Sequence, residues 1–449
     1  MNNIYNFLSN VWKDLIEENK QNNAFIPFLL LLITLPISMA INNILLGVFF
    51  ISSLLYCKKK SSFLTVTLFI PILLFIWMSA SYFWTIDLKR TTSAIPKEIA
   101  LLLIPLSFAF IPSFTKNQKD KILKLYSYTM LVYVLFFLIR AFIRFLIAKD
   151  TSVFFYHGPD NDTDTGLVPR LLNAIHFSVF VAIAFFYFFI KEHKTKIEQI
   201  ISVFLFVFVI LLSSKNIILI VVLLLLIQVF FYSKVANRLR LRNLTIMLLL
   251  LGLVVSFGKI KERFLVEFRT NTDKSISHNV ALNKEKGINN ISIADAWTKD
   301  KFHPSDYFPG TAFRVYQFRM FTEFLNEEPI FWTGFGLNAS LNKLLEKEKQ
   351  YNLYPGYGTF NFHNQYVQNF AELGAIGFLL LIFILYLNTK KAFMTKDFIH
   401  IVFSVLMLSL FLTESFLWRQ RGIIFFTAFY CLFNSSPYLS NKQQYSTLL

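Results

Sequence analysis

Charged residues are scarce in this chain of 449 residues, at 16% against 55% hydrophobic residues. Soluble domains carry about 25% charged residues, so a soluble protein of this length would lack the polar surface it needs. Cysteine is nearly absent. Cys57 and Cys431 stand at the ends of apolar runs, without the spacing of a metal site, a redox site or a disulfide framework. These shortages argue against a soluble enzyme and against a disulfide-stabilised secreted domain.

The sequence also lacks the marks of a nucleic-acid-binding or secreted protein. Its formal charge is +17, but no zinc-finger, recognition-helix or RNA-binding motif accompanies that charge. The N-terminus has no basic stretch followed by a short apolar core and a cleavage site, so we predict no cleaved signal peptide. Residues 1–23 are instead expected to form a polar, amphipathic lead-in. No nucleic-acid partner is expected.

Long apolar runs are abundant. A membrane-spanning helix needs about 20 mostly apolar residues, because the hydrocarbon core is about 30 Å thick and each residue rises 1.5 Å. The run around Ser213, Ser214 and Lys215 covers about 35 residues, too many for one crossing, and is divided into two spans. The chain is therefore predicted to be an all-α integral membrane protein with about twelve transmembrane helices. The candidate spans are 24–40, 43–57, 62–80, 94–112, 125–147, 171–190, 198–213, 216–232, 243–257, 371–388, 398–413 and 422–436.

Basic residues predict the orientation, because lysine and arginine in short loops prefer the cytoplasmic side. With the N-terminus inside, the basic clusters fall on the cytoplasmic side, whereas the loop at 150–164 on the other side is acidic. We therefore predict a multi-pass protein of the bacterial inner membrane with both termini in the cytoplasm. The net charge is interpreted as a topology signal. The basic clusters lie at 58–60, 116–124, 191–196, 234–242 and 390–396.

One large loop, 258–370, separates the ninth and tenth predicted spans and is placed outside the cytoplasm. A loop of this length is usually functional or disordered. We expect 271–300 to be irregular, helices over 311–325 and 338–350, and a third helix that starts near Phe362 and continues into the tenth span. The predicted domains are a bundle of nine spans (1–257), this partly helical periplasmic loop (258–370) and three further spans (371–449).

Polar residues continue from the end of the loop into the tenth span. His363 stands at the outer mouth of that span, and Asn364, Gln368 and Glu372 follow at a spacing that places them on one helix face. A polar stripe that enters the bilayer is costly unless it faces a cavity or other helices. The residues alone leave a second interpretation open, in which the histidine caps the helix and the nearby glycines serve helix packing.

Cations gather at the outer ends of several predicted helices. Arg314 and Arg319 lie on one helix of the loop, and their planar guanidinium groups suit phosphate oxygens. A surface salt-bridged to nearby glutamates is the alternative. Lys215 lies at an external turn, where snorkelling to the interface is the ordinary explanation. Together these cations would form a basic cup that suits an anionic headgroup such as a diphosphate. Further outward-facing members are Arg170 and His176, and, at the last hairpin, Arg419 and Arg421 beside Glu414.

Two segments resemble the signatures of the O-antigen ligase and polymerase superfamily. The run from His363-Asn364 to Glu372-Leu373-Gly374-Ala375-Ile376-Gly377 is similar to its "HN…L…E.G..G" motif. The run Arg314…Phe318…Phe324…Pro329…Gly334-Phe335-Gly336 is similar to its "R…W……F…P..G.G" segment, with Phe318 in place of tryptophan. Ser214-Lys215 resembles the Ser-Arg pair of the family. The lysine keeps the positive charge but lacks the planar, paired N–H donors of a guanidinium. The twelve-span layout with a late large loop also matches.

The resemblance implies a metal-independent membrane glycosyltransferase without a cofactor. Such an enzyme moves a glycan from an undecaprenyl diphosphate carrier to an acceptor hydroxyl, such as that of the lipid A core, on the periplasmic face. His363 would act as the base or position the acceptor, and Arg314 would hold the diphosphate. The residues expected to help bind the diphosphate or the glycan are Lys215, Arg170, Arg319, Asn364, Glu372, His176 and Arg419.

Several functions remain compatible with the sequence. A ligase, a repeat-unit polymerase and a protein O-glycan ligase share the same chemistry within the family. The single large late loop favours the ligase, because polymerases more often divide their external residues between two loops. A secondary transporter is the alternative from another class, but the inverted repeats and broken helices typical of transporters are not evident.

Overall fold

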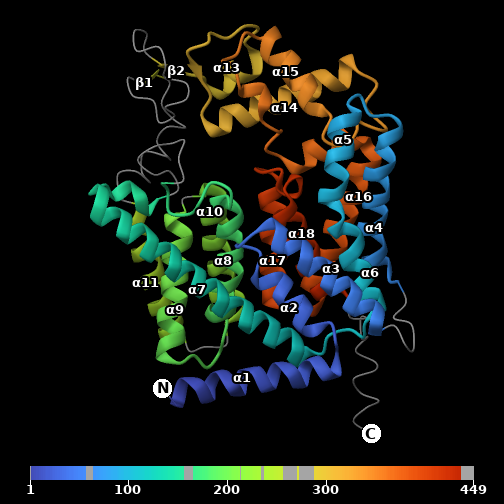
Figure 1. The fold of residues 1–449 in the computed structure, drawn as a ribbon. Helices are drawn as coiled ribbons and strands as arrows, with labels where there is room; N and C mark the ends of the chain where they lie inside the picture. The colour runs from blue at the N-terminus through green and yellow to red at the C-terminus, as the bar shows by residue number, and fades with distance from the viewer. Residues whose placement is uncertain are drawn as a thin grey trace.

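The computed structural model describes residues 2–56, 64–155, 165–212, 214–233, 237–255, 271–272 and 288–435. Helices dominate these ranges (Figure 1). The helices before the large loop are α1 (Asn2–Gln21), α2 (Phe25–Ile33), α3 (Met39–Tyr56), α4 (Val66–Ala80), α5 (Leu88–Ala94), α6 (Ala100–Phe110), α7 (Lys116–Ala148), α8 (Ala174–Phe189), α9 (Lys196–Leu211), α10 (Lys215–Ile227) and α11 (Asn237–Val255). Those in and after the loop are α13 (Ile293–Thr298), α14 (Gly310–Glu327), α15 (Ser340–Gln350), α16 (Gln365–Thr395), α17 (Phe398–Phe411) and α18 (Gln420–Asn434).

The apolar helices are those of a multi-pass membrane protein. Each of the twelve predicted spans overlaps a helix. Among the described residues, five helical segments are long and apolar enough to cross a membrane, and three shorter apolar helices accompany them. The count of twelve spans is not confirmed by these lengths and stays a prediction. The five long segments are Val66–Phe83, Leu88–Phe110, Lys116–Ala148, Lys215–Tyr232 and Gln365–Thr395.

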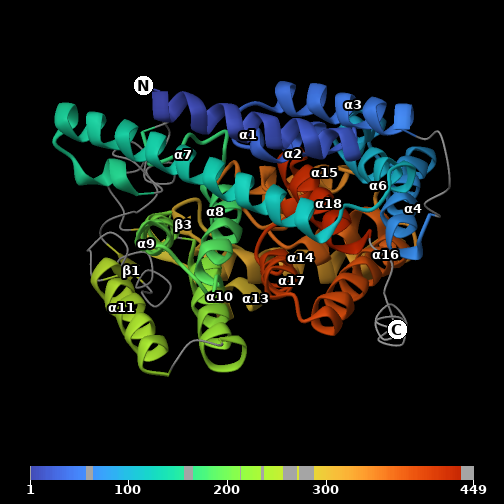
Figure 2. The ribbon, with the colours of Figure 1, turned by 90° about the horizontal axis from the view of Figure 1, so that it is seen from below.

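Helix α1 lies across one end of the bundle, opposite α13, α14 and α15 (Figures 1 and 2). It is held there by Lys121 at the start of α7, whose Nζ lies 2.6 Å from Asp14 Oδ1 and 2.5 Å from Glu18 Oε1. The predicted lead-in is thus a helix that rests on the bundle end where the N-terminus of α7 lies. The basic cluster 58–60, most of the acidic loop, and residues 258–270 and 273–287 lie outside the described residues.

Residues 288–363 fold into a small domain with its own hydrophobic core, whose buried members include Phe302, Phe308, Tyr316 and Phe324. The helices predicted over 311–325 and 338–350 are present as α14 and α15. The fold is mostly helical, as predicted. Within 271–300, where irregular structure was expected, the described residues contain helix α13 and two short strands, while 273–287 lie outside the described part of the chain. A carboxylate–amide contact supports the pairing of the strands, with Asn289 Nδ2 3.0 Å from Asp306 Oδ1. The strands β1 (Asn271–Thr272), β2 (Ile288–Asn290) and β3 (Asp306–Tyr307) form one sheet, β1–β2 antiparallel and β2–β3 parallel.

The small domain joins the bundle at a kink in α16. Gly374 has a φ of 66°, which an L side chain rarely adopts, and a Cβ there would lie 2.2 Å from the carbonyl carbon of Trp332. The loop after α14 inserts into the kink, where the amides of Phe335 and Gly336 donate to the carbonyl oxygens of Ala371 and Glu372, each at 2.9 Å. The two stretches that carry the family resemblance therefore pack against each other.

Candidate active site

His363 lies in the turn that leads into α16. Its φ of 46° is in the left-handed region, which is uncommon for a residue with a side chain. The turn is held because the His363 amide donates to Asn361 Oδ1 at 3.0 Å, and Asn364 Oδ1 caps α16 by accepting from the amides of Tyr366 and Val367. The imidazole Nδ1 lies 3.3 Å from Glu414 Oε2. This carboxylate orients the ring and leaves Nε2 on its other edge.

Arg314 holds the other side of the same carboxylate. Its Nη2 lies 3.2 Å from Glu414 Oε1 and 2.8 Å from the carbonyl oxygen of Thr413, to which Nε also donates at 3.0 Å. Its Nη1 donates to the carbonyl oxygen of Gly310 at 2.9 Å. A guanidinium has five N–H bonds. These contacts use four of the five: the N–H on Nε, one N–H on Nη1 and both on Nη2. The second N–H on Nη1 is not used by them.

Glu414 is the centre of the cluster. Burial by itself would raise the pKa of this carboxyl. The hydrogen bond from His363 and the charges of His363, Arg314 and Arg419 outweigh burial and lower the pKa below its ordinary value. Glu414 is therefore ionised at neutral pH, and a negative charge faces His363 Nδ1. Glu414 was visible in the sequence at the last hairpin but was not predicted to belong to the site. Its signal was an acid at the outer end of an apolar helix pair.

Lys215 begins α10 and is half-buried. Its neighbour Asn216 connects this helix start to the site, because Asn216 Nδ2 donates to Thr413 Oγ1 at 2.8 Å and to the carbonyl oxygen of Ser409 at 2.9 Å. Thr413 is the residue whose carbonyl accepts from Arg314. The structure thus brings the α10 start, the turn after α17 and the α14 arginine together. Ser213 lies outside the described residues.

The remaining outer cations occupy different positions around this turn. Arg419 is exposed, and its charge reaches Glu414. His176 is only 3% exposed and stacks on Phe416 with the ring centroids 4.3 Å apart. It therefore packs against the 3₁₀ turn η7 (Phe416–Trp418). Arg170 is exposed in the loop before α8.

Two of the predicted site residues serve local structure. Arg319 belongs to an ion cluster inside the small domain, with Nε 2.9 Å from Glu323 Oε1 and Nη2 3.1 Å from the hydroxyl of Tyr351. Glu372 Oε1 accepts from Ser340 Oγ at 2.8 Å and from Gln368 Nε2 at 2.6 Å, beside the α16 kink. These contacts place neither residue with His363.

An aromatic wall stands beside the histidine. The rings of Phe313 and Phe360 have their centroids 6.0 Å and 5.9 Å from that of His363, and Phe360 is 47% exposed. This wall was not predictable from the sequence, because phenylalanine is so frequent in the chain that single residues carry no signal. In the described ranges no group of three or more His, Cys, Asp or Glu side chains could hold a metal ion.

The fold and the site define a multi-pass helical membrane protein in which a His–Glu–Arg cluster lies where a small domain meets the bundle. Residues 200–382 match the family model described as O-antigen ligase. Over this range, which contains both segments that resemble the family signatures, the chain is similar to the O-antigen ligase family. No curated protein matches the chain significantly. The matched range includes His363, Arg314 and Lys215, while Glu414 and Arg419 lie beyond it.

Proposed function

We propose that the protein transfers a glycan from an undecaprenyl diphosphate carrier to an acceptor hydroxyl, as an O-antigen ligase does, on the periplasmic side of the inner membrane. The lipid A core is the proposed acceptor. The observation that carries this proposal is the contact of His363 Nδ1 with the ionised Glu414, which Arg314 holds from its other side. That arrangement prepares a histidine to accept a proton.

The acceptor side of the reaction uses His363. With Nδ1–H directed at Glu414, the lone pair of Nε2 is available to the acceptor hydroxyl. The hydroxyl oxygen forms a bond to the anomeric carbon while Nε2 takes the hydroxyl proton, and the Glu414 carboxylate stabilises the imidazolium that results. The exposed face of Phe360 offers an apolar surface to the acceptor beside this nitrogen.

The donor side of the reaction uses the outer cations. The bond between the anomeric carbon and the diphosphate oxygen breaks, and the lipid diphosphate leaves with the bonding electrons. Fixed positive charges near that oxygen stabilise the charge that develops in the transition state. Arg419, which is exposed, and Lys215 are the cations proposed to bind the diphosphate, together with the remaining N–H of Arg314.

Purified full-length protein in liposomes, supplied with an undecaprenyl diphosphate glycan and a lipid A core acceptor, tests the proposal. His363→Ala is expected to reduce the transfer rate by about 10²–10⁴-fold, the usual contribution of a general base. His193→Ala is the matched control, because His193 is exposed and lies between α8 and α9, outside the cluster. Transfer by His363→Ala at the wild-type rate would remove the proposed role.

Surface polysaccharide from a deletion strain separates ligase from polymerase. A ligase is indicated when attachment to the core is lost while the carrier-linked polymer remains intact. A core that bears a single repeat unit would indicate a polymerase instead.

A further inference from the structure

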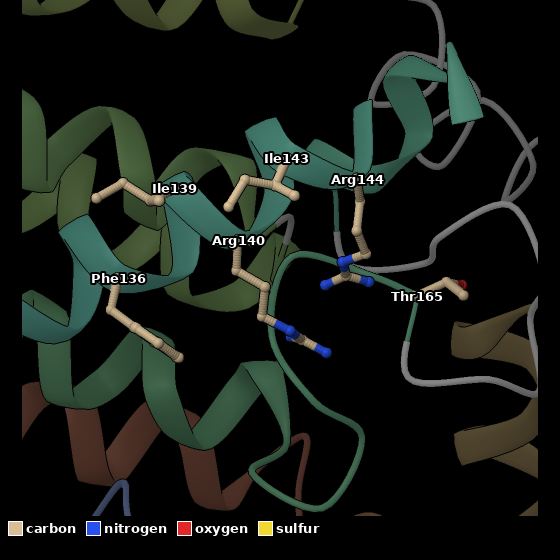
Figure 3. A pocket seen from close by; sticks show the side chains of 6 residues that line it. All are labelled: Phe136, Ile139, Arg140, Ile143, Arg144 and Thr165. Carbon is tan, nitrogen blue, oxygen red and sulfur yellow. The ribbon is translucent and has the colours of Figure 1, made fainter. Parts of the chain in front are cut away.

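A second cationic site lies on α7, apart from the His–Glu–Arg cluster. Arg140 and Arg144 are one helical turn apart and project from the same side of the helix (Figure 3). They line an open groove of about 550 Å³. The remaining lining residues are Phe136, Ile139, Ile143 and Thr165.

The surroundings of these arginines are those of a lipid-facing helix. Phe136, Ile139 and Ile143 are each more than half exposed, and Ile147 one turn further is 78% exposed. A large apolar stripe of this kind on a membrane helix is covered by acyl chains. The two guanidinium groups are half-buried directly beside it.

The groove therefore combines two chemical features. Its guanidinium groups suit phosphate oxygens, which they bind through paired N–H donors. Its apolar wall suits the first part of an acyl chain. A molecule that carries a phosphate directly next to hydrocarbon, and that reaches a helix from the side, is a membrane lipid.

We propose that Arg140 and Arg144 bind the phosphate of an anionic membrane phospholipid, whose acyl chain lies along Phe136, Ile139 and Ile143. The site is independent of glycan transfer. It also tethers the loop before α8, because Arg144 Nη2 donates to the carbonyl oxygen of Gly166 at 3.0 Å. The same loop is held at its far end by Arg421, whose Nη1 donates to the carbonyl oxygen of Leu171 at 2.6 Å.

Native mass spectrometry of the full-length protein tests the proposal, with phosphatidylglycerol and phosphatidylethanolamine of identical acyl chains as probes. Wild type is expected to retain phosphatidylglycerol in preference to the zwitterionic lipid. Arg140→Gln/Arg144→Gln should bind phosphatidylglycerol about 30-fold more weakly, because each cation near an anionic lipid contributes about a factor of five. The Arg140→Lys/Arg144→Lys variant keeps both positive charges but loses the paired N–H donors, so its affinity for phosphatidylglycerol should fall by less.

The matched control is Lys116→Gln/Lys149→Gln, which removes two charges from the ends of the same helix, outside the groove. This variant should bind phosphatidylglycerol like wild type. Unchanged lipid retention in both arginine variants would overturn the proposal. Displacement of phosphatidylglycerol by an equal concentration of undecaprenyl phosphate would also overturn the choice of phospholipid, since the groove would then take the carrier lipid.

Discussion

At the scale of single residues, the site is built around a strained histidine. A positive φ in a residue other than glycine costs free energy, and such conformations persist only where surrounding contacts fix them. At His363 the contacts come from Asn361, from the capped start of α16 and from Glu414. The imidazole is therefore positioned by the turn that contains it and by Glu414 in the turn after α17.

Glu414→Gln tests the orienting carboxylate. The substitution keeps the shape but removes the negative charge that would stabilise the imidazolium and pair with Arg314. We expect the turnover number to fall by about 10²-fold, with a much smaller change in the Michaelis constant of the acceptor. Steady-state transfer assays measure both values. A rise in the Michaelis constant at unchanged turnover would mean that Glu414 binds the acceptor rather than orienting His363.

The motif residues were predictable from the sequence, and their partners were not. His363 and Arg314 lie in the segments that resemble family signatures, whereas Glu414 meets them only through the tertiary fold. The sequence places Arg314 and Arg319 on one helix, but this proximity did not show that their side chains have different partners. Five residues rotate a helix by about 140° net, so the two arginines face different neighbours. Arg319 turns into the small domain for that reason.

At the scale of elements, the α16 kink is the joint between the domain and the bundle. Gly374→Ala would place a methyl group 2.2 Å from the Trp332 backbone and force a positive φ on alanine. We expect a loss of folding stability of more than about 2 kcal/mol, measured as a lower thermal unfolding midpoint of the purified protein. Gly47→Ala is the control, because nothing lies within 4 Å of the added Cβ. Equal midpoints for the two variants would contradict this account of the kink.

The ion cluster of the small domain makes its stability depend on pH. Burial tends to raise the pKa of Glu323, but the hydrogen bonds and charges of Lys347, Tyr351 and Arg319 outweigh it, so the pKa is lowered. A lowered carboxyl pKa contributes stability above its unfolded-state value, near 4.3, and that contribution is lost as the pH falls through the folded-state value. Wild type should therefore lose more thermal stability than Glu323→Gln between pH 7 and pH 3. Equal losses of thermal stability in wild type and Glu323→Gln would show that the ion pairs of Glu323 do not stabilise the domain.

Helix positions were more predictable than helix ends. The apolar runs located the helices, and the spacing within the loop located α14 and α15. The ends depend on local hydrogen bonding that hydropathy does not register. The run at 24–40, for example, contains the nine-residue helix α2, which ends at Ile33, and the first two residues of α3. Pro36 lies between the two helices and has no N–H to donate to a helical hydrogen bond.

At the scale of the whole molecule, the proposed reaction requires that the small domain and α1 lie on opposite sides of the membrane. They lie at opposite ends of the bundle (Figure 1). The predicted cytoplasmic clusters at 116–124, 191–196 and 390–396 flank the ends of helices away from the small domain. From the positive-inside rule we therefore expect the small domain to lie in the periplasm.

Thiol labelling in cells tests this orientation after Cys57 and Cys431 are replaced by serine. Asp300, whose side chain is 98% exposed in the small domain, and Lys13, exposed on α1, supply the two positions. A membrane-impermeant maleimide should label Asp300→Cys once the outer membrane is permeabilised, and should label Lys13→Cys only after the inner membrane is broken. The reverse pattern would place His363 in the cytoplasm, where neither the translocated glycan nor its acceptor could reach it. The proposed proton acceptor and the proposed diphosphate-binding cations lie at one end of the bundle, so a single orientation decides whether both face the compartment that holds the glycan and its acceptor.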